Sequence, residues 1–137
     1  MKQCIEDKQD FCLLIKDSPV LANTMRVKIK DNSIWDIGSH IPLQEGQGNF
    51  IGIAKYSKRG AQLLAREMNY LVQDTKNLTA YYVAGLIPLA TQGVKIGFQV
   101  VREPWIEIDF LEDYEYAQKI IYPLVKVSEI TTVKIKK

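Results

Sequence analysis

The stretch that indicates an α/β fold is PWIEIDFLEDY, residues Pro104 to Tyr114. Its first half has the composition of a short buried strand and its second half begins a helix, which predicts a strand–helix junction. Successive strand side chains point to opposite faces, so Trp105, Glu107 and Asp109 share one face. The Cα atoms of the two acids are then roughly 6.6 Å apart. Ligands of open α/β sheets bind outside the carboxyl ends of strands, so this pair is placed to hold a divalent metal.

A second interpretation of the same junction needs no ligand. Asp109 is a favourable N-cap for the helix that follows, and Glu112, three residues later, completes a capping box. The residues alone leave the helix-cap and the metal-ligand interpretations both open.

Five further strands are expected before this junction. The run Phe11–Ile15 is apolar without alternation, which is typical of a strand covered on both faces. Alternating residues on either side of Asp31-Asn32 predict a β-hairpin, because both turn residues tolerate positive φ. The remaining two expected strands are Phe50–Tyr56 and Lys95–Val101.

The expected helices alternate with these strands. Ser57 is placed to cap a helix from Lys58 to Val72, and a second helix is expected from about Leu78 to Ala90, kinked or shortened at Pro88. A final helix from Leu111 should stop at Pro123. Two weaker expectations concern the ends of the chain, namely a polar helix over residues 1–8 and an edge strand or loose tail over residues 125–137.

Composition favours one soluble domain, 1–137. The 137 residues are 47% hydrophobic and 25% charged, and the formal net charge is +2. That charge is too small to imply a nucleic-acid or membrane partner, and no apolar run is long enough to span a bilayer. Cys4 and Cys12 suggest no disulfide framework, so we expect a cytoplasmic protein. His40 is the only histidine, which excludes multi-histidine metal sites.

Four blocks in register resemble a known family. They are FIGIAKYSKRGA at residues 50–61, AYY at 80–82, QGV at 92–94, and PWIEID at 104–109 with Glu112-Asp113. They resemble the carboxyl half of nucleotidyltransferases of the sugar-phosphate nucleotidyltransferase superfamily, most of all the phosphocholine- and phosphonate-type cytidylyltransferases. The resemblance covers roughly Lys8 to Pro123.

This resemblance implies a fold, a reaction and a metal. The fold would be a partial Rossmann-like mixed sheet with a β-hairpin and helices on its faces. The partners would be a nucleoside triphosphate and a phosphorylated small-molecule acceptor, joined with release of pyrophosphate. Mg²⁺ would be held by Asp109, with Glu107 as an alternative ligand or as a neighbour that hydrogen-bonds the ligand.

The resemblance also suggests acceptor-binding residues. Gly52 would bring backbone close to the acceptor, or would be a packing glycine. Lys55 would meet the acceptor's phosphate, or would be a solvated lysine at a strand end. Tyr81 and Tyr82, with Trp105 sharing the face of the acids, would form walls of a cation-binding aromatic pocket, or would simply pack.

The glycine-rich, phosphate-wrapping loop that opens these enzymes has no counterpart in this sequence. The chain therefore corresponds to an acceptor-binding C-terminal half whose N-terminal nucleotide-binding half is absent, and it is expected to be inactive alone. The alternative is a catalytically inactive remnant that acts as a small-molecule-binding or self-associating module. A homodimer or a complementing N-terminal half would be its partner, since missing strands leave an open sheet edge.

Overall fold

The computed structural model describes residues 2–125 and divides the chain into two compact units. Unit 1 is Met1–Val101 and unit 2 is Arg102–Lys137, of which residues 102–125 are described. Each unit is considered by itself below. The expectation for the tail at residues 126–137 lies outside the described residues.

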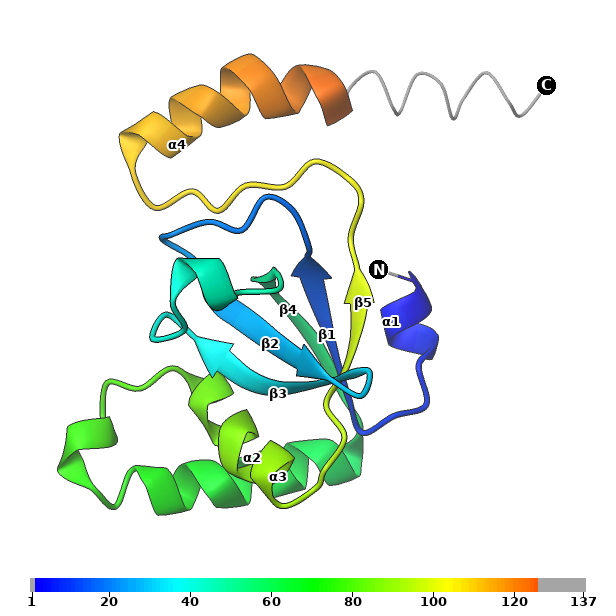
Figure 1. Cartoon of the computed structure of the whole chain (residues 1–137), viewed down its shortest axis with the longest axis vertical. Helices are drawn as coiled ribbons and strands as arrows, with labels where there is room; N and C mark the ends of the chain where they lie inside the picture. Colours follow the sequence, from blue (N-terminus) through cyan, green and yellow to red (C-terminus); the bar gives the residue numbers. More distant parts are fainter. Residues whose placement is uncertain (1, 126–137) are drawn as a thin grey trace. The chain divides into compact units, whose positions relative to one another are not determined.

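Unit 1 is built on a five-stranded mixed sheet in the order β3-β2-β4-β1-β5, shown in Figure 1. The strands are β1 (Phe11–Lys16), β2 (Arg26–Lys30), β3 (Ser33–Gly38), β4 (Asn49–Tyr56) and β5 (Gly97–Val100). Only β1 and β5 are parallel, and the other neighbours are antiparallel. The apolar run Phe11–Ile15 is fully buried between β4 and β5, which confirms the prediction of a covered strand and of an α/β fold.

The β2–β3 hairpin forms as the sequence predicts. Asp31 and Asn32 both have positive φ, 49° and 57°, as a tight two-residue turn requires. The pairing then slips, because Lys28 faces Asp36 while Ile29 faces Ile34. Trp35 is therefore an extra, bulged residue in β3.

The helical segments of residues 58–91 lie together in Figure 1, whereas the short first helix, residues 2–6, lies apart from them beside β5. The main helix, α2 (Lys58–Leu71), begins where predicted, with the Ser57 hydroxyl accepting from the Gly60 N–H at 3.0 Å. Gly60 is required there, since a Cβ would lie 2.3 Å from the Asp10 carbonyl oxygen. The remaining elements are short: α1 (Lys2–Glu6), η1 (Leu43–Glu45), η2 (Thr75–Asn77), η3 (Tyr82–Gly85) and α3 (Leu86–Thr91).

The second expected helix is shorter than predicted. Instead of one helix over residues 78–90, the chain forms the 3₁₀ turn η3 and then α3. Pro88 is the third residue of α3, where its missing N–H would have no intrahelical acceptor. The proline is therefore accommodated without a kink.

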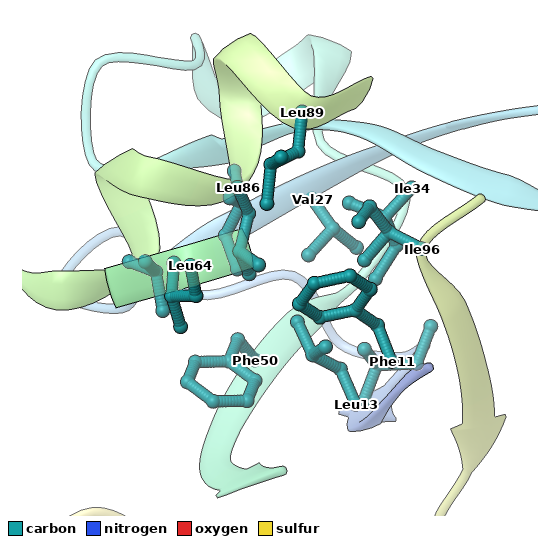
Figure 2. Close-up of a cluster of buried hydrophobic side chains, with 12 residues drawn as sticks. Phe11, Leu13, Val27, Ile34, Phe50, Leu64, Leu86, Leu89 and Ile96 are labelled. Atoms are coloured by element: carbon teal, nitrogen blue, oxygen red, sulfur yellow. The ribbon is translucent and has the colours of Figure 1, made fainter. Parts of the chain in front are cut away.

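The hydrophobic core lies between the sheet and these helices. Figure 2 shows Leu64, Leu86 and Leu89 from the helices meeting Phe11, Val27 and Phe50 from the strands. All of the fully buried apolar residues among those described lie in unit 1, the last being Ile96.

Unit 2 differs from the prediction. Residues 104–109 form no strand, although their sequence alternates, because no described segment supplies them with a ladder of hydrogen bonds. The helix α4 (Leu111–Tyr116) runs into a π-helical turn, η4 (Ala117–Ile121), and the chain stays helical to Val125. Pro123 does not end the helix. The wider π turn just before it shifts the hydrogen bonding, with the Tyr122 N–H donating to the Ala117 carbonyl.

Among the described residues, no helix combines the length and the apolar character needed to cross a membrane.

Candidate functional site

Asp109 does not cap helix α4. The N-cap position is occupied by Phe110, whose side chain has no polar atom. The cap comes instead from Asp113, whose carboxylate accepts the Phe110 N–H at 3.0 Å and the Asp109 N–H at 3.2 Å. The predicted capping box of Asp109 and Glu112 is therefore wrong, and the Asp109 carboxylate is left exposed.

Three carboxylates influence one another at this junction. Partial loss of hydration raises the pKa of Glu107, and the negative charges of Asp109 and Asp113 raise it further. Glu107 is exposed by surface area, so water still screens much of this repulsion. No group of three or more metal-ligating side chains is assembled within residues 2–125. The junction thus offers neighbouring carboxylate oxygens without a preformed cage.

Trp105 precedes these acids and is half-buried. It lies in the extended segment that replaces the predicted strand, so the shared face expected from strand alternation is not established. Trp105, Glu107 and Asp109 all belong to unit 2, whereas the other predicted acceptor-binding residues belong to unit 1: Gly52, Lys55, Tyr81 and Tyr82.

Gly52 lies in an irregular part of β4. The register with β1 passes from Leu13–Ala54 directly to Ile15–Phe50, so β4 bulges around Gly52. Its φ is +80°, and a Cβ built there would meet nothing within 4 Å. The glycine serves the backbone conformation and leaves open space beside it, so the packing interpretation is wrong.

Lys55 is used within the fold. Its ammonium donates to the carbonyl oxygens of Asp7 at 2.5 Å and Gln9 at 2.8 Å, which fastens the segment before β1 to the end of β4. This bonding within the fold is a role that neither interpretation of Lys55 from the sequence, phosphate contact or solvated lysine, anticipated.

Tyr81 and Tyr82 differ in their surroundings. Tyr81 precedes η3 and is 69% exposed. The Tyr82 ring meets Tyr56 edge to face at 6.5 Å, and Tyr56 meets Phe11 at 5.6 Å. The hydroxyl of Tyr56 is buried without a hydrogen-bond partner among the described residues, and burial raises its pKa. Tyr82 therefore packs in a row of aromatic rings with Tyr56 and Phe11, whereas the exposed Tyr81 is not part of this row.

Sequence reasoning missed an acid in unit 1. Asp17 directly follows β1, and the ends of β1 and β5 lie together, since the Val101 N–H donates to the Ile15 carbonyl at 2.8 Å. The signal was present in the sequence, since Asp17 is a carboxylate that comes just after the apolar run Phe11–Ile15.

The loop that begins with Asp17 is held by two buried polar residues. Asn49 is fully buried; its amide nitrogen donates to the carbonyls of Lys16 and Pro19, and its oxygen accepts from the Leu21 N–H. Arg26, 7% exposed, donates to backbone carbonyls of this loop and, at 2.6 Å, to that of Ile41. These contacts make the edge where β1 ends a rigid platform.

Comparison of the sequence with models of known protein families and with curated proteins gave no match.

Proposed function

We propose that this chain is the acceptor-binding part of a Mg²⁺-dependent nucleotidyltransferase with a Rossmann-like sheet. It would transfer a cytidylyl group from CTP to a phosphorylated small molecule. The sequence blocks at residues 50–61 and 104–109 support the assignment to this family. The metal site is supported by one structural observation: the Asp109 carboxylate does not cap helix α4 and is available to bind a ligand.

The donor set at the α4 junction fits Mg²⁺. This cation takes oxygen ligands and is usually bound by one or two carboxylates together with substrate phosphates. Glu107 and Asp109 offer such oxygens, and the pKa of Glu107 is raised first by partial loss of hydration and then by repulsion from the charge of Asp109. A bound cation would remove this repulsion, which supports the assignment of these two residues as ligands.

The reaction requires charge neutralisation and positioning. An oxygen of the acceptor's phosphate forms a bond to the α-phosphorus, and the bond from that phosphorus to the β-phosphate bridging oxygen breaks with its electron pair. Mg²⁺ would supply neutralisation of the charge on the phosphates. Within unit 1 taken by itself, the open space beside Gly52 would let an acceptor approach the backbone.

The proposed enzyme needs a nucleotide-binding partner. The sequence carries no glycine-rich phosphate loop, so we assign the triphosphate-wrapping role to a separate or preceding polypeptide. Activity of residues 1–137 would then depend on that part.

Metal binding tests the site independently of activity. In a Mn²⁺ titration, the amide NMR signals of residues 105–113 should broaden selectively, and Mg²⁺ should compete. Asp109→Asn should weaken the effect at least about fivefold, whereas the matched neighbour change Glu112→Gln should leave it unchanged. Equal broadening in both variants, or none in the natural chain, would refute the metal site.

Activity is tested by complementation. Mixed with the amino-terminal half of a cytidylyltransferase, the chain should release pyrophosphate from CTP in the presence of phosphocholine or a phosphonate. Asp109→Asn should abolish release. If Mn²⁺ binds at Asp109 but no combination releases pyrophosphate, the metal site survives and the transferase proposal fails.

A second candidate function, self-association, is favoured by the surface of unit 2. Apolar side chains recur along residues 108–124 and are 46% exposed or more: Ile108, Phe110, Leu111, Tyr114, Tyr116, Ile120, Tyr122 and Leu124. Such surfaces are typical of protein contacts. Light scattering should then give a dimer that Leu111→Ser with Ile120→Ser dissociates; a monomer at all concentrations would exclude this function.

A further inference from the structure

The β2–β3 hairpin presents Trp35 to solvent. As the extra residue of the bulge, Trp35 is turned away from the core that its neighbours Ile34 and Ile37 enter. Its side chain is 46% exposed, while those two are almost fully buried. Bulges commonly re-aim side chains near functional sites, so this indole is a candidate contact for a ligand.

Lys28 holds the indole in place. Its ammonium lies 5.4 Å from the centre of the Trp35 ring, and it is also ion-paired with Glu45. A cation on one side of the ring restricts its rotation and leaves the remaining ring surface for another contact. The aromatic group is therefore partly pre-organised.

Trp35 lines a hollow of about 310 Å³ between the hairpin and the segment that follows α3. Ile34 and Val94 contribute apolar lining. The two sides are tied together, because the Ile34 N–H donates to the Ile96 carbonyl and the Ile96 N–H donates to the Ser33 hydroxyl, both at 2.9 Å. This volume is at the lower end of the range for small-molecule sites, so a ligand would be small.

The lining of the hollow carries an excess of positive charge. Lys30 and Lys95 line it against one acid, Asp31. Within residues 2–125 neither ammonium is engaged in an ion pair. The nearby end of α3 is partly neutralised, since the Ala90 and Leu89 carbonyls accept the N–H groups of Gly93 and Val94. Two lysines and an exposed aromatic ring lining one hollow suit a ligand that carries both a phosphate and a planar ring.

We propose that the hollow beside Trp35 binds a small planar aromatic ligand carrying a phosphate, of the mononucleotide class. The ring stacks on the indole surface that Lys28 leaves free, and the phosphate lies between Lys30 and Lys95. This site is independent of the proposed transferase function and requires neither Mg²⁺ nor Asp109.

Intrinsic fluorescence tests the proposal directly. The chain has two tryptophans, so Trp105→Phe leaves Trp35 as the only emitter. Adenosine 5′-monophosphate, titrated in EDTA, should change this emission saturably. Adenosine and inorganic phosphate should each bind at least about tenfold more weakly, because each lacks one half of the recognition. Raising the salt concentration should weaken nucleotide binding, because salt screens the attraction between the phosphate and the lysines.

Variants inside and outside the hollow complete the experiment. Lys30→Ala with Lys95→Ala should raise the apparent Kd at least about fivefold, whereas Lys76→Ala, an exposed lysine in η2, and Asp109→Ala should not change it. Circular dichroism melts confirm that each variant is folded. The proposal is overturned if no saturable change occurs up to about 10 mM nucleotide, if adenosine binds as well as its phosphate, or if Lys76→Ala weakens binding as much as the double variant.

Discussion

Asn49 shows how a single polar side chain can organise an edge of this sheet. Fully buried at the start of β4, it bonds backbone groups on both sides of the Ser18-Pro19 turn and also lies 2.8 Å from the Thr24 hydroxyl. A buried amide that satisfies all its partners fixes one arrangement of the loop, because no water competes for those bonds.

We expect Asn49→Ala to lower the free energy of unfolding by about 2–4 kcal/mol, because the Leu21 N–H and two carbonyls lose their buried partner. Urea denaturation measures the change. Asn77→Ala is the matched control: its amide donates to the Leu71 carbonyl at 3.0 Å, and the loss should stay below about 1 kcal/mol. Equal losses in the two variants would contradict this role.

Cys12 gives a pH-dependent prediction. Burial, followed by the neighbouring Cys4 thiol, raises the pKa of Cys12 from 9.0 to about 12. Between these values the unfolded chain loses the thiol proton while the folded chain keeps it, so stability falls as pH rises above 9.

The slope approaches about 1.4 kcal/mol per pH unit for one group. Between pH 8.5 and 10, the free energy of unfolding should therefore fall more steeply in the natural chain than in Cys12→Ala. Urea titrations at each pH measure both slopes. Comparing the slopes removes the pH-independent loss of stability that comes from the smaller side chain in Cys12→Ala. Parallel curves would mean that the folded thiol titrates normally.

The residues that sequence reasoning placed correctly act locally. Asp31-Asn32 and Ser57 work through bonds within three or four residues, so their neighbours in the sequence reveal them. Asn49 was not foreseen because its partners lie 25 to 33 residues away. Lys55 was misjudged for the same reason, since its acceptors at Asp7 and Gln9 precede it by more than 40 residues.

At the scale of elements, helix α4 is capped by a different acid from the one that its sequence pattern predicts. The pattern Asp109-x-x-Glu112 satisfies the capping-box rule, yet the N-cap position lies one residue later, at Phe110, and Asp113 is the capping acid. Both frames fit the local sequence, and a carboxylate one residue further on reaches the free N–H groups. Capping frames of neighbouring acids are therefore poorly determined by spacing alone.

Asp113→Ala should accordingly weaken the first turn of α4 by about 0.5–1 kcal/mol, because the Phe110 N–H loses its acceptor. Hydrogen exchange of the amides of residues 109–113 should accelerate about two- to fivefold. Glu112→Ala, which removes an acid of the same turn, should change these rates much less. Faster exchange only in the Glu112 variant would restore the capping box predicted from the sequence.

Strand pairing explains the largest error in the elements. The PWIEID segment has strong β-forming composition, but a strand exists only where a neighbour supplies its hydrogen bonds. Phe11–Ile15 has two such neighbours in β4 and β5, whereas residues 104–109 have no strand partner in the described chain. Composition predicts the tendency in both cases, and only the topology of the sheet decides which one is realised.

At the scale of the whole molecule, the core belongs to unit 1. Its buried cluster draws on Phe11 in β1, Val27 in the hairpin, Leu64 in α2 and Leu86 in α3, and ends at Ile96 before β5. The mixed sheet and its helices close this cluster within residues 2–101. Unit 2 contributes a helix whose apolar side chains are largely exposed. The buried apolar residues thus end just before Val101, where the chain also divides into its two compact units.

A chain ending at Val101 should therefore fold by itself. It keeps the whole buried cluster and the bond from the Val101 N–H to the Ile15 carbonyl, and about 100 residues suffice for an independent domain. We expect a cooperative urea transition, dispersed NMR signals, and a free energy of unfolding within about 1 kcal/mol of the full chain. A matched chain ending at Thr91 loses Ile96 and β5 and should not unfold cooperatively. If the longer fragment also lacks a cooperative transition, the core of unit 1 depends on residues after Val101 and the two units fold as one.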